Sequence, residues 1–393
     1  MNNQVVELHC HSHYSPLDGL NTPSEYMKRA KEIGMPAMAV TDHGTLAAHR
    51  EWVSEAKLAG IKPILGVEAY ISPTDMYDRR SKAKREDGTD VYNHIILLAQ
   101  NDTGLETLNR LNRKSWEEGF FHKNRIDSEL LLSDNEGLIV LSGCMNGLIA
   151  KALERGEKEE AVRLAHEYKA VLGDRFFIEI QGSNPIELNH GLLEVSTLTG
   201  VAPVVTSDCH YARKEDLWIE EAMLILSTNP KYNNKADLKS ASKMKDYVER
   251  FNYLYPDRQM TFAEIEIYLR SAVEQKELLA EQGIPDDAVT NTMVVANMVE
   301  NIEPYEGLDL LPSKTDDPDR LLREKVIAGA KARGTYGDPK ADARREEELQ
   351  IIADKNFSPY FIPLANAVSW SRTKGIRIGP GRGSGAGSQV NYE

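Results

Sequence analysis

The stretch VELHCHSHYS (residues 6–15) places His9, His11 and His13 at alternate positions. In an extended chain, alternate side chains point to the same side, so the three imidazoles would line one face of a strand. Neutral imidazole is the commonest metal ligand among side chains. A single His-x-His pattern is weak evidence for metal, so the rest of the sequence must decide the question.

The bulk composition describes a globular protein. The chain has 393 residues, 41% of them hydrophobic and 27% charged, which predicts one large domain and a second unit. No apolar run approaches the roughly 18 residues of a membrane span, and the N-terminus lacks the layout of a signal peptide. We therefore expect a cytoplasmic protein that does not contact a membrane.

Cysteine content and net charge restrict the chemistry. Cys10, Cys144 and Cys209 are few and widely separated, so a disulfide framework is not expected. The net charge of −14 argues against a simple cationic surface for nucleic acid. Bound cations would still let an acidic site reach phosphates.

Seven apolar runs rich in β-forming residues alternate with stretches of helical periodicity, several of which end at a glycine. The runs cover residues 4–9, 35–41, 61–71, 94–101, 137–143, 175–181 and 202–208. This alternation predicts an α/β fold with a parallel sheet. An open doubly wound sheet and a closed barrel would produce the same periodicity.

Polar residues at the ends of these runs favour the barrel. They are His9, His11, Asp42, His43, Glu68, Cys144, Asp208 and His210. In a parallel barrel the carboxyl ends of the strands meet at one mouth, whereas an open sheet spreads them along a line. We therefore predict a distorted barrel of about seven strands that holds metal at its mouth. His94 begins its run, so either that strand runs in the opposite sense or His94 is not a ligand.

Imidazoles, carboxylates and one thiol suit zinc, manganese or iron. The set is too large for one tetrahedral ion, so we expect two or three divalent ions, with Glu68 as the bridging carboxylate. Such a site would hydrolyse phosphoesters with a metal-bound water. Asp42 is expected to support the site and to cap the next helix, and Cys144 could be an ordinary buried residue. The remaining histidines are expected on the surface or on helix faces: His13, His49, His122, His166 and His190.

Several segments resemble the polymerase and histidinol phosphatase (PHP) domain of bacterial and phage C-family polymerases, the DNA polymerase III alpha subunits. They are LHCHSHYSPLDG (8–19), AVTDHG (39–44), GVEAY (66–70), the His94 segment, LSGC (141–144) and TSDCHY (206–211). The resemblance implies a distorted seven-stranded barrel and metal ligands at His9, His11, Asp18, His43, Glu68, His94, Cys144, Asp208 and His210. Asp18, and the choice of His94, come only from this resemblance. An intact set resembles members whose PHP domain is a 3′–5′ exonuclease.

The resemblance continues to the end of the chain. We expect the PHP barrel over residues 1–212, alternatively extended by helical elements to about residue 300. A helical extension over 213–312 and an incomplete N-terminal part of the polymerase palm over 313–393 would follow. The glycine-rich stretch RIGPGRGSGAGSQV (377–390) resembles a palm loop that handles the incoming triphosphate. This implies phosphate binding by Gly381, Arg382, Gly383, Ser384 and Ser388.

The family's catalytic palm aspartates follow this loop, so we do not expect the chain to polymerise DNA alone. The expected partners are primer-template DNA, a C-terminal polymerase fragment and other replisome subunits, with deoxynucleoside triphosphates and magnesium serving the complete polymerase. A working exonuclease and a metal-stapled assembly module are alternative hypotheses, and a free-standing phosphoesterase is a weaker third. A bacterial or a phage gene would fit either reading.

Overall fold

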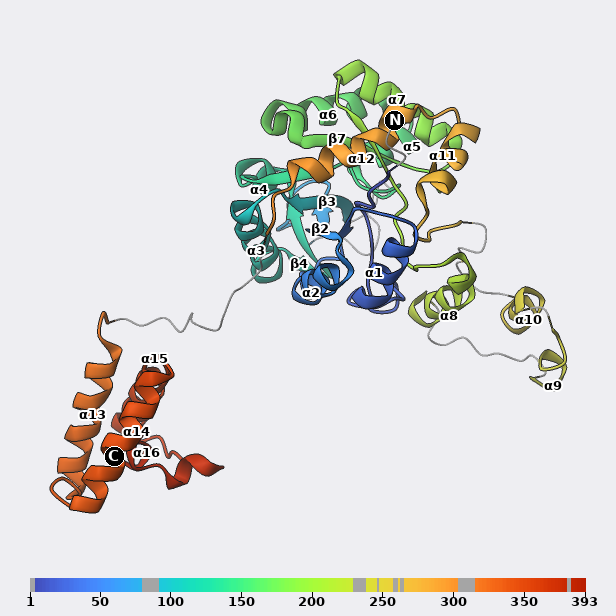
Figure 1. Cartoon of the computed structure of the whole chain (residues 1–393). Coiled ribbons are helices and arrows are strands. Elements are labelled where there is room, and N and C mark those ends of the chain that lie inside the picture. Colours follow the sequence, from blue (N-terminus) through green and yellow to red (C-terminus); the bar gives the residue numbers. More distant parts are fainter. Residues whose placement is uncertain are drawn as a thin grey trace. The chain divides into compact units, whose positions relative to one another are not determined.

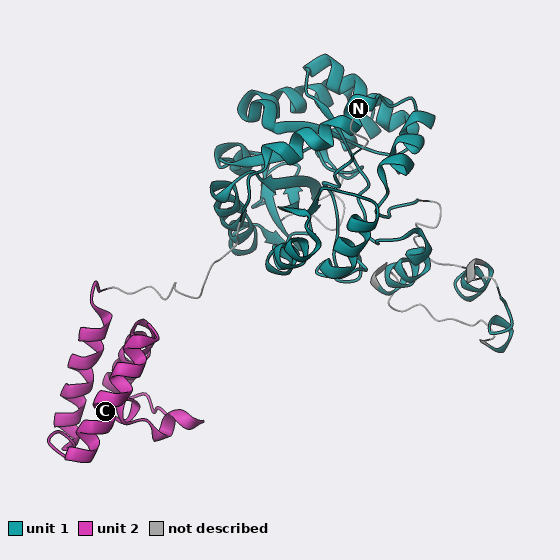
Figure 2. Cartoon of the chain, viewed as in Figure 1, with its two compact units in different colours: residues 1–304 teal, residues 305–393 magenta. Residues whose placement is uncertain are grey.

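The protein is described here from a computed structural model, over residues 4–79, 92–228, 238–245, 247–256, 261, 265–302, 315–379 and 383–393. The chain divides into two compact units, residues 1–304 and 305–393 (Figures 1 and 2). Among the described residues, none of the helices has the length and apolar character to cross a membrane.

A curled mixed sheet forms the centre of the first unit. Its strands are β1 (Ala37–Val40), β2 (Lys62–Ser72), β3 (Asn93–Ala99), β4 (Phe120–Phe121), β5 (Lys123–Asp127), β6 (Leu138–Leu141), β7 (Phe176–Gln181) and β8 (Pro203–Thr206). The strand order is β4-β5-β2-β3-β6-β7-β8, and β1 also pairs with β2. The N-terminal segment around residues 7–10 connects the β1 side of the sheet to the β8 side, because Glu7 bridges Met38 of β1 while Cys10 bridges Cys209 just after β8. The result is a distorted barrel of the predicted α/β class.

Two features of the sheet correct the predicted all-parallel arrangement. β3 is antiparallel to both β2 and β6, and an additional hairpin, β4–β5, extends the sheet beyond β2. Parallel neighbours need a crossover connection, usually a helix. Residues 73–92 between β2 and β3 are mostly polar and contain Pro73 and Gly88, so their sequence lacks an apolar helical face. The first predicted run, residues 4–9, forms single bridges in place of a continuous strand.

Alternate residues of the strands fill the inside of the sheet. Ile64, Ile96, Ile139, Phe177 and Val204 belong to one buried cluster, which also includes side chains of α12 (Asp286–Met298). Their neighbours along the strands belong to a second cluster that packs against the surrounding helices. Burying each such aliphatic side chain contributes about 1.5–3 kcal/mol.

One end of the barrel is closed by α12 and the residues after it. The Lys62 amino group at the start of β2 donates to Ala296 and Val299 carbonyls, and the Asn291 amide donates to Pro203 O at the start of β8. The polar strand ends therefore lie at the opposite end.

Helices cover the outside of the sheet (Figure 1). They are α1 (Pro23–Glu32), α2 (His49–Ala59), α3 (Asp102–Glu117), α4 (Ser128–Ser133), α5 (Leu148–Glu154), α6 (Lys158–Leu172) and α7 (Ile186–Thr199). The later helices are α8 (Leu217–Thr228), α9 (Leu238–Ala241), α10 (Tyr247–Leu254), α11 (Ala272–Glu281) and α12. Local signals set several ends: Thr22 and Glu25 form a capping box on α1, and Gly60 and Gly200 end α2 and α7 in left-handed conformations.

The second unit is a small helical assembly. It contains α13 (Pro318–Arg333), α14 (Pro339–Asp354), α15 (Ser358–Thr373) and the short α16 (Gln389–Tyr392). Its core is limited to Leu322, Val326, Leu349, Ile362 and Val390.

Gly143 shows how closely the backbone packs beside the mouth of the barrel. Its φ is +87°, and a Cβ there would lie 2.6 Å from the carbonyl oxygen of His94. We expect Gly143→Ala to lower the free energy of unfolding by about 2–4 kcal/mol, because the strained conformation and the clash add. Gly156→Ala has a similar φ of +76° with no atom within 4 Å, and should cost only about 1–2 kcal/mol. Urea unfolding of both variants measures the difference, and equal losses would contradict the close approach.

His49 is the first residue of α2, on a helix as expected, and its side chain is buried. Its Nε2 lies 2.8 Å from Gly66 O, and burial lowers the pKa of His49 to about 4. The unfolded chain therefore binds the extra proton first, so stability is lost as pH falls from about 6.5 towards 4.

We expect His49→Gln to remove this component, because glutamine stays neutral. Between pH 7.5 and pH 5 the wild type should lose about 2 kcal/mol more than the variant, as measured by urea unfolding. Identical pH dependence of the two proteins would show that His49 is protonated in the folded state.

Candidate metal centre

The inner rows of the strands change from apolar to polar as they approach the open end. On β2, Ile64 is followed two residues later by Gly66 and then by Glu68. On β8, Val204 is followed by Thr206, and Asp208 lies two residues beyond the end of the strand. Side chains two residues apart share a face, so each apolar row ends in a carboxylate. β3 runs antiparallel to its neighbours. His94, at the start of β3, therefore lies at the same end of the barrel as Glu68, which is the first of the two alternatives considered for this residue.

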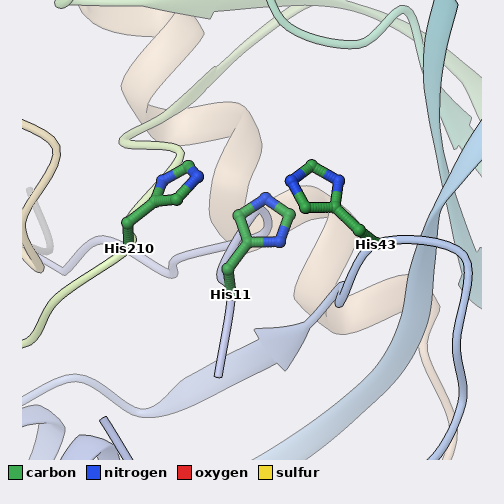
Figure 3. Close-up of side chains that lie close together, drawn as sticks. All are labelled: His11, His43 and His210. Carbon is green, nitrogen blue, oxygen red and sulfur yellow. The ribbon is translucent and has the colours of Figure 1, made fainter. Parts of the chain in front are cut away.

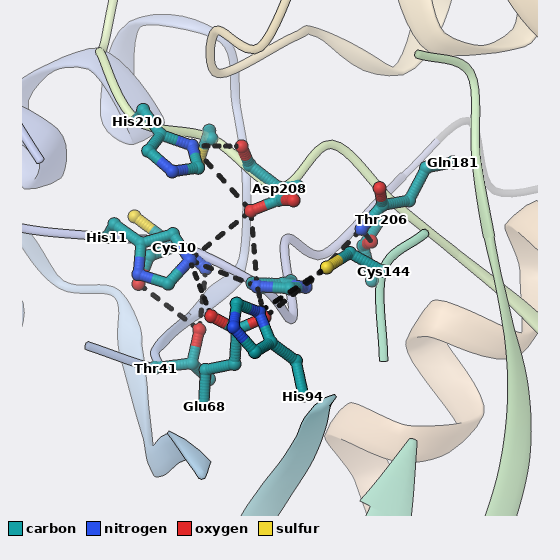
Figure 4. A network of polar contacts seen from close by, with 12 residues as sticks. Cys10, His11, Thr41, Glu68, His94, Cys144, Gln181, Thr206, Asp208 and His210 are labelled. Carbon is teal, nitrogen blue, oxygen red and sulfur yellow. Dashed lines mark hydrogen bonds and ion pairs between the residues drawn. The ribbon is translucent and has the colours of Figure 1, made fainter. Parts of the chain in front are cut away.

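The structure brings all nine predicted ligands into one cluster. They are His9, His11, Asp18, His43, Glu68, His94, Cys144, Asp208 and His210. Figure 4 shows much of this network, in which side chains from the N-terminal segment, from strands β2, β3, β7 and β8, and from the loops after β1, β6 and β8 converge.

Glu68 lies at the centre of the cluster. Its Oε1 is 2.9 Å from His94 Nδ1 and 3.3 Å from His9 Nε2. Its Oε2 is 2.5 Å from His43 Nδ1 and 3.6 Å from His11 Nε2. The two oxygens thus face different pairs of imidazoles, as the predicted bridging carboxylate requires.

Three histidines form a neighbouring group (Figure 3). The His11 ring lies 4.2 Å from the His43 ring and 4.5 Å from the His210 ring, centre to centre. Within the described part of the chain, three overlapping sets have ligand atoms within 4.8 Å of one another: His11, His43 and His210; His9, His11 and Asp208; His43, Glu68 and His94. Overlapping sets are what two or three neighbouring ions would need.

Asp18 and Cys144 complete the cluster from two loops. Asp18 Oδ2 lies 2.5 Å from His43 Nε2 and 3.5 Å from His210 Nε2. Cys144 Sγ lies 3.6 Å from both Glu68 Oε1 and His94 Nδ1. Both residues therefore occupy positions where they could coordinate an ion.

The charges within the centre oppose one another. Burial alone would lower the pKa of His9, but the Asp208, Glu179 and Glu68 carboxylates raise it well above its usual value. Burial, together with neighbouring His43 and His210, lowers the pKa of His11 to about 3, so this ring is neutral. A neutral ring has a free nitrogen lone pair for a metal.

The side chains fit divalent ions. Among the candidate ligands, three buried atoms make close contacts with other ligands but no hydrogen bond of acceptable geometry: His43 Nδ1, Glu68 Oε2 and Asp208 Oδ1. Polar atoms buried in this way cost free energy that a shared cation would offset. Nitrogen, carboxylate and thiol ligands together match zinc, manganese or iron.

Glu179 was not among the predicted site residues, yet it holds His9 in place. Its Oε1 lies 2.7 Å from His9 Nδ1 and accepts hydrogen bonds from Gln181 Nε2 and Thr206 Oγ1. This contact directs His9 Nε2 towards the centre, as carboxylates behind metal-binding histidines generally do. A charged residue within the buried strand FFIEIQ was the available signal.

Asp42 supports the site without capping α2, whose N-cap is Ala48. Its carboxylate instead accepts bonds from the backbone and hydroxyl of Ser12 and from the hydroxyl of Ser15. Burial raises the pKa of Asp42 to about 6. The helix begins seven residues later, at His49, so the predicted cap was wrong, while the side chain orders the loop that carries Asp18.

The predicted phosphate loop is only partly described. Gly381 and Arg382 lie outside the described residues, whereas Gly383 has a φ of +96° and Ser384 begins a short 3₁₀ turn. Ser388 Oγ donates to Glu348 Oε2 at 2.7 Å and accepts from Asn391 N. Ser388 therefore caps α16 in this structure, and phosphate binding by the loop stays a prediction.

Comparison with known proteins shows which protein families this chain resembles. Residues 7–183 match the PHP domain family, and residues 320–393 match the family described as the bacterial DNA polymerase III alpha NTPase domain. DNA polymerase III subunit alpha of Mycobacterium tuberculosis H37Rv is 33% identical over 408 residues, which cover 98% of this chain and 32% of that protein. The chain is similar to DNA polymerase III alpha subunits over nearly its whole length, with a PHP domain over residues 7–183. The expected resemblance is thereby confirmed at both ends of the chain.

The chain spans about a third of the length of the curated relatives it matches. The Aquifex aeolicus DNA polymerase III subunit alpha, 32% identical over 406 residues, is covered over 33% of its length and matches 100% of this chain. Among solved structures, an amidohydrolase from Chromobacterium violaceum is similar, with a TM-score of 0.37 and 17% identity over 52% of this chain and 87% of that one.

Glu68→Gln should release metal, because one neutral oxygen and an amide would replace the carboxylate shared by four imidazoles. We expect at least a tenfold weaker affinity for zinc or manganese and a loss of bound ions on dialysis. Elemental analysis by mass spectrometry measures this, with exposed His166→Gln on α6 as the control. A Glu68→Gln variant with the full wild-type metal content would contradict the central role of this carboxylate.

Proposed function

We propose that the PHP domain of this chain is a metal-dependent 3′–5′ exonuclease that removes nucleotides from the primer end of DNA. The convergence of nine ligand-type side chains around Glu68 carries the proposal. Similarity to DNA polymerase III alpha subunits supports DNA as the substrate, since an exonuclease beside a polymerase would act on mispaired 3′ ends.

Divalent ions bound at this centre would polarise the phosphodiester and lower the pKa of water. The protein's part is to hold the ligands. Glu68 would join two ions through its separate oxygens, and Glu179 would keep His9 in the orientation that presents Nε2. The side chains of Asp18 and His210 are 28% and 9% exposed, so they face the side from which a substrate would enter.

The second unit supports a role beside a polymerase active site. Its match to the polymerase III alpha NTPase family favours binding of deoxynucleoside triphosphates with magnesium in the complete polymerase. Large apolar side chains on this unit are exposed: Phe357, Tyr360, Leu364, Trp370 and Ile376. Exposed apolar surface of this kind favours association with another protein part. We propose a C-terminal polymerase portion, primer-template DNA and other replisome subunits as partners, inside a bacterial cell.

A structural role for the metal is the second candidate. His9 and His11 are fully buried and Glu68 is 1% exposed, which suits ions that join strands and never meet a substrate. Metal would then contribute folding free energy, and the chain would serve polymerase assembly.

Asp18→Asn separates the two candidates, because Asp18 lies at the rim and its replacement should spare the fold. We expect the wild type, with manganese or zinc, to shorten a mismatched primer-template from the 3′ end, and the variant to be at least about 100-fold slower. Gel analysis of labelled primer measures the rates, and exposed Asp174→Asn serves as the matched control.

Circular dichroism and thermal unfolding should be unchanged in Asp18→Asn. An inactive wild type whose melting temperature falls on chelation would favour the structural role. Equal rates in wild type and Asp18→Asn would assign the nuclease activity to another source.

A further inference from the structure

The β4–β5 hairpin brings a lysine to the edge of the metal centre. β5 pairs in parallel with the end of β2, so that Arg125 lies opposite Tyr70. The turn between the two short strands is His122, whose φ is +61°. Lys123, the residue after this turn, is half-buried and is carried to the same end of the sheet as Glu68.

A series of ring contacts links this lysine to the candidate ligands. Lys123 Nζ lies 4.9 Å from the centre of the Tyr70 ring. The Tyr70 ring is stacked on His43 at 5.8 Å and lies edge-on to His94 at 5.4 Å. Tyr70 is buried, so it sets the position of Lys123 and is not itself a surface for substrate.

Tyr92 adds another aromatic ring to this series of contacts. Its half-buried ring lies 5.1 Å from the Tyr70 ring and is parallel to the His94 ring, with 5° between the planes and 6.2 Å between the centres. Aromatic faces beside nucleic-acid sites stack with bases whatever their sequence. Lys123 and Tyr92 therefore offer a cation and an aromatic ring beside the place where the phosphodiester would lie.

The ammonium group of Lys123 is not neutralised by a carboxylate within the described residues. In the part of the chain that the structure describes, Lys123 forms no ion pair with a carboxylate, although the chain carries a net charge of −14. The Tyr70 ring attracts the ammonium group only weakly compared with an anion. An ammonium group one aromatic ring away from the candidate ligands is suited to a phosphate of a nucleic-acid substrate bound there.

We propose that Lys123 and Tyr92 form a subsite for single-stranded DNA beside the metal centre. Lys123 would neutralise the phosphate next to the scissile one, and the Tyr92 ring would stack on a base near the 3′ end. This inference rests on the proposed exonuclease function and specifies how its substrate is held. Neither residue takes part in bond cleavage, so both act through binding.

The test compares Lys123→Met with wild type on a short single-stranded oligonucleotide. We expect KM to rise about tenfold while kcat stays within about twofold, because uniform binding is lost. The slope of log affinity against log salt should fall by about 0.7, the value for one phosphate contact on a single strand. Lys123→Arg should restore most of the affinity, and Tyr92→Leu should weaken binding about 5-fold to 100-fold.

Lys331→Met is the matched control, since Lys331 Nζ lies 5.0 Å from the Tyr336 ring in the second unit and its removal changes the net charge equally. Equal effects of Lys123→Met and Lys331→Met would overturn the subsite, because they would reflect total charge. Loss of bound metal in Lys123→Met would also overturn it, because the lysine would then serve only the structure.

Binding of an oligonucleotide with phosphorothioate linkages, followed by fluorescence anisotropy, separates the subsite from the proposed catalysis. If the wild type binds this probe through Lys123 but does not cleave normal DNA, the subsite stands and the exonuclease proposal fails. If the wild type does not bind the probe, or binds it as well after Lys123→Met, the subsite is refuted.

Discussion

The candidate centre is organised by one buried carboxylate, Glu68, which is shared by four imidazoles from three different segments. Charged and polar groups inside a protein are costly unless they are paired. Here Glu68 contacts four of the imidazoles, while Asp18, Glu179 and Asp208 pair with the histidines around it. The surrounding fold serves this arrangement. Apolar side chains of the strands pack next to the candidate centre inside the barrel, and α12 closes the opposite end. Glu179 orients His9, and Asp42 binds the loop that leads to Asp18.

Much of the centre could be predicted from the sequence, because parallel strands end at one edge. His43 follows an apolar run, Glu68 lies late in one and Asp208 ends one, so their convergence needed only the assumption of a closed sheet. Asp18 and His94 required a family resemblance. Asp18 belongs to a loop without periodicity, and the position of His94 depends on the direction of β3, which local sequence does not determine.

The residues that were missed have a common physical cause. Glu179 is buried by tertiary packing, and its partner, His9, is far away in the sequence. Asp42 was expected to cap the next helix, but its oxygens contact the loop of Ser12 and Ser15 instead. Local patterns predict which elements form, whereas such long-range hydrogen bonds depend on how the elements pack.

The N-terminal segment has a consequence for the whole barrel, because it joins β1 on one side to the residues after β8 on the other and also carries His9 and His11. It makes isolated bridges to these neighbours in place of a continuous strand. If His9 and His11 bind the proposed ions, ion binding and closure of the barrel at this segment would be thermodynamically linked. Removal of the ions would then favour opening of the barrel at this segment.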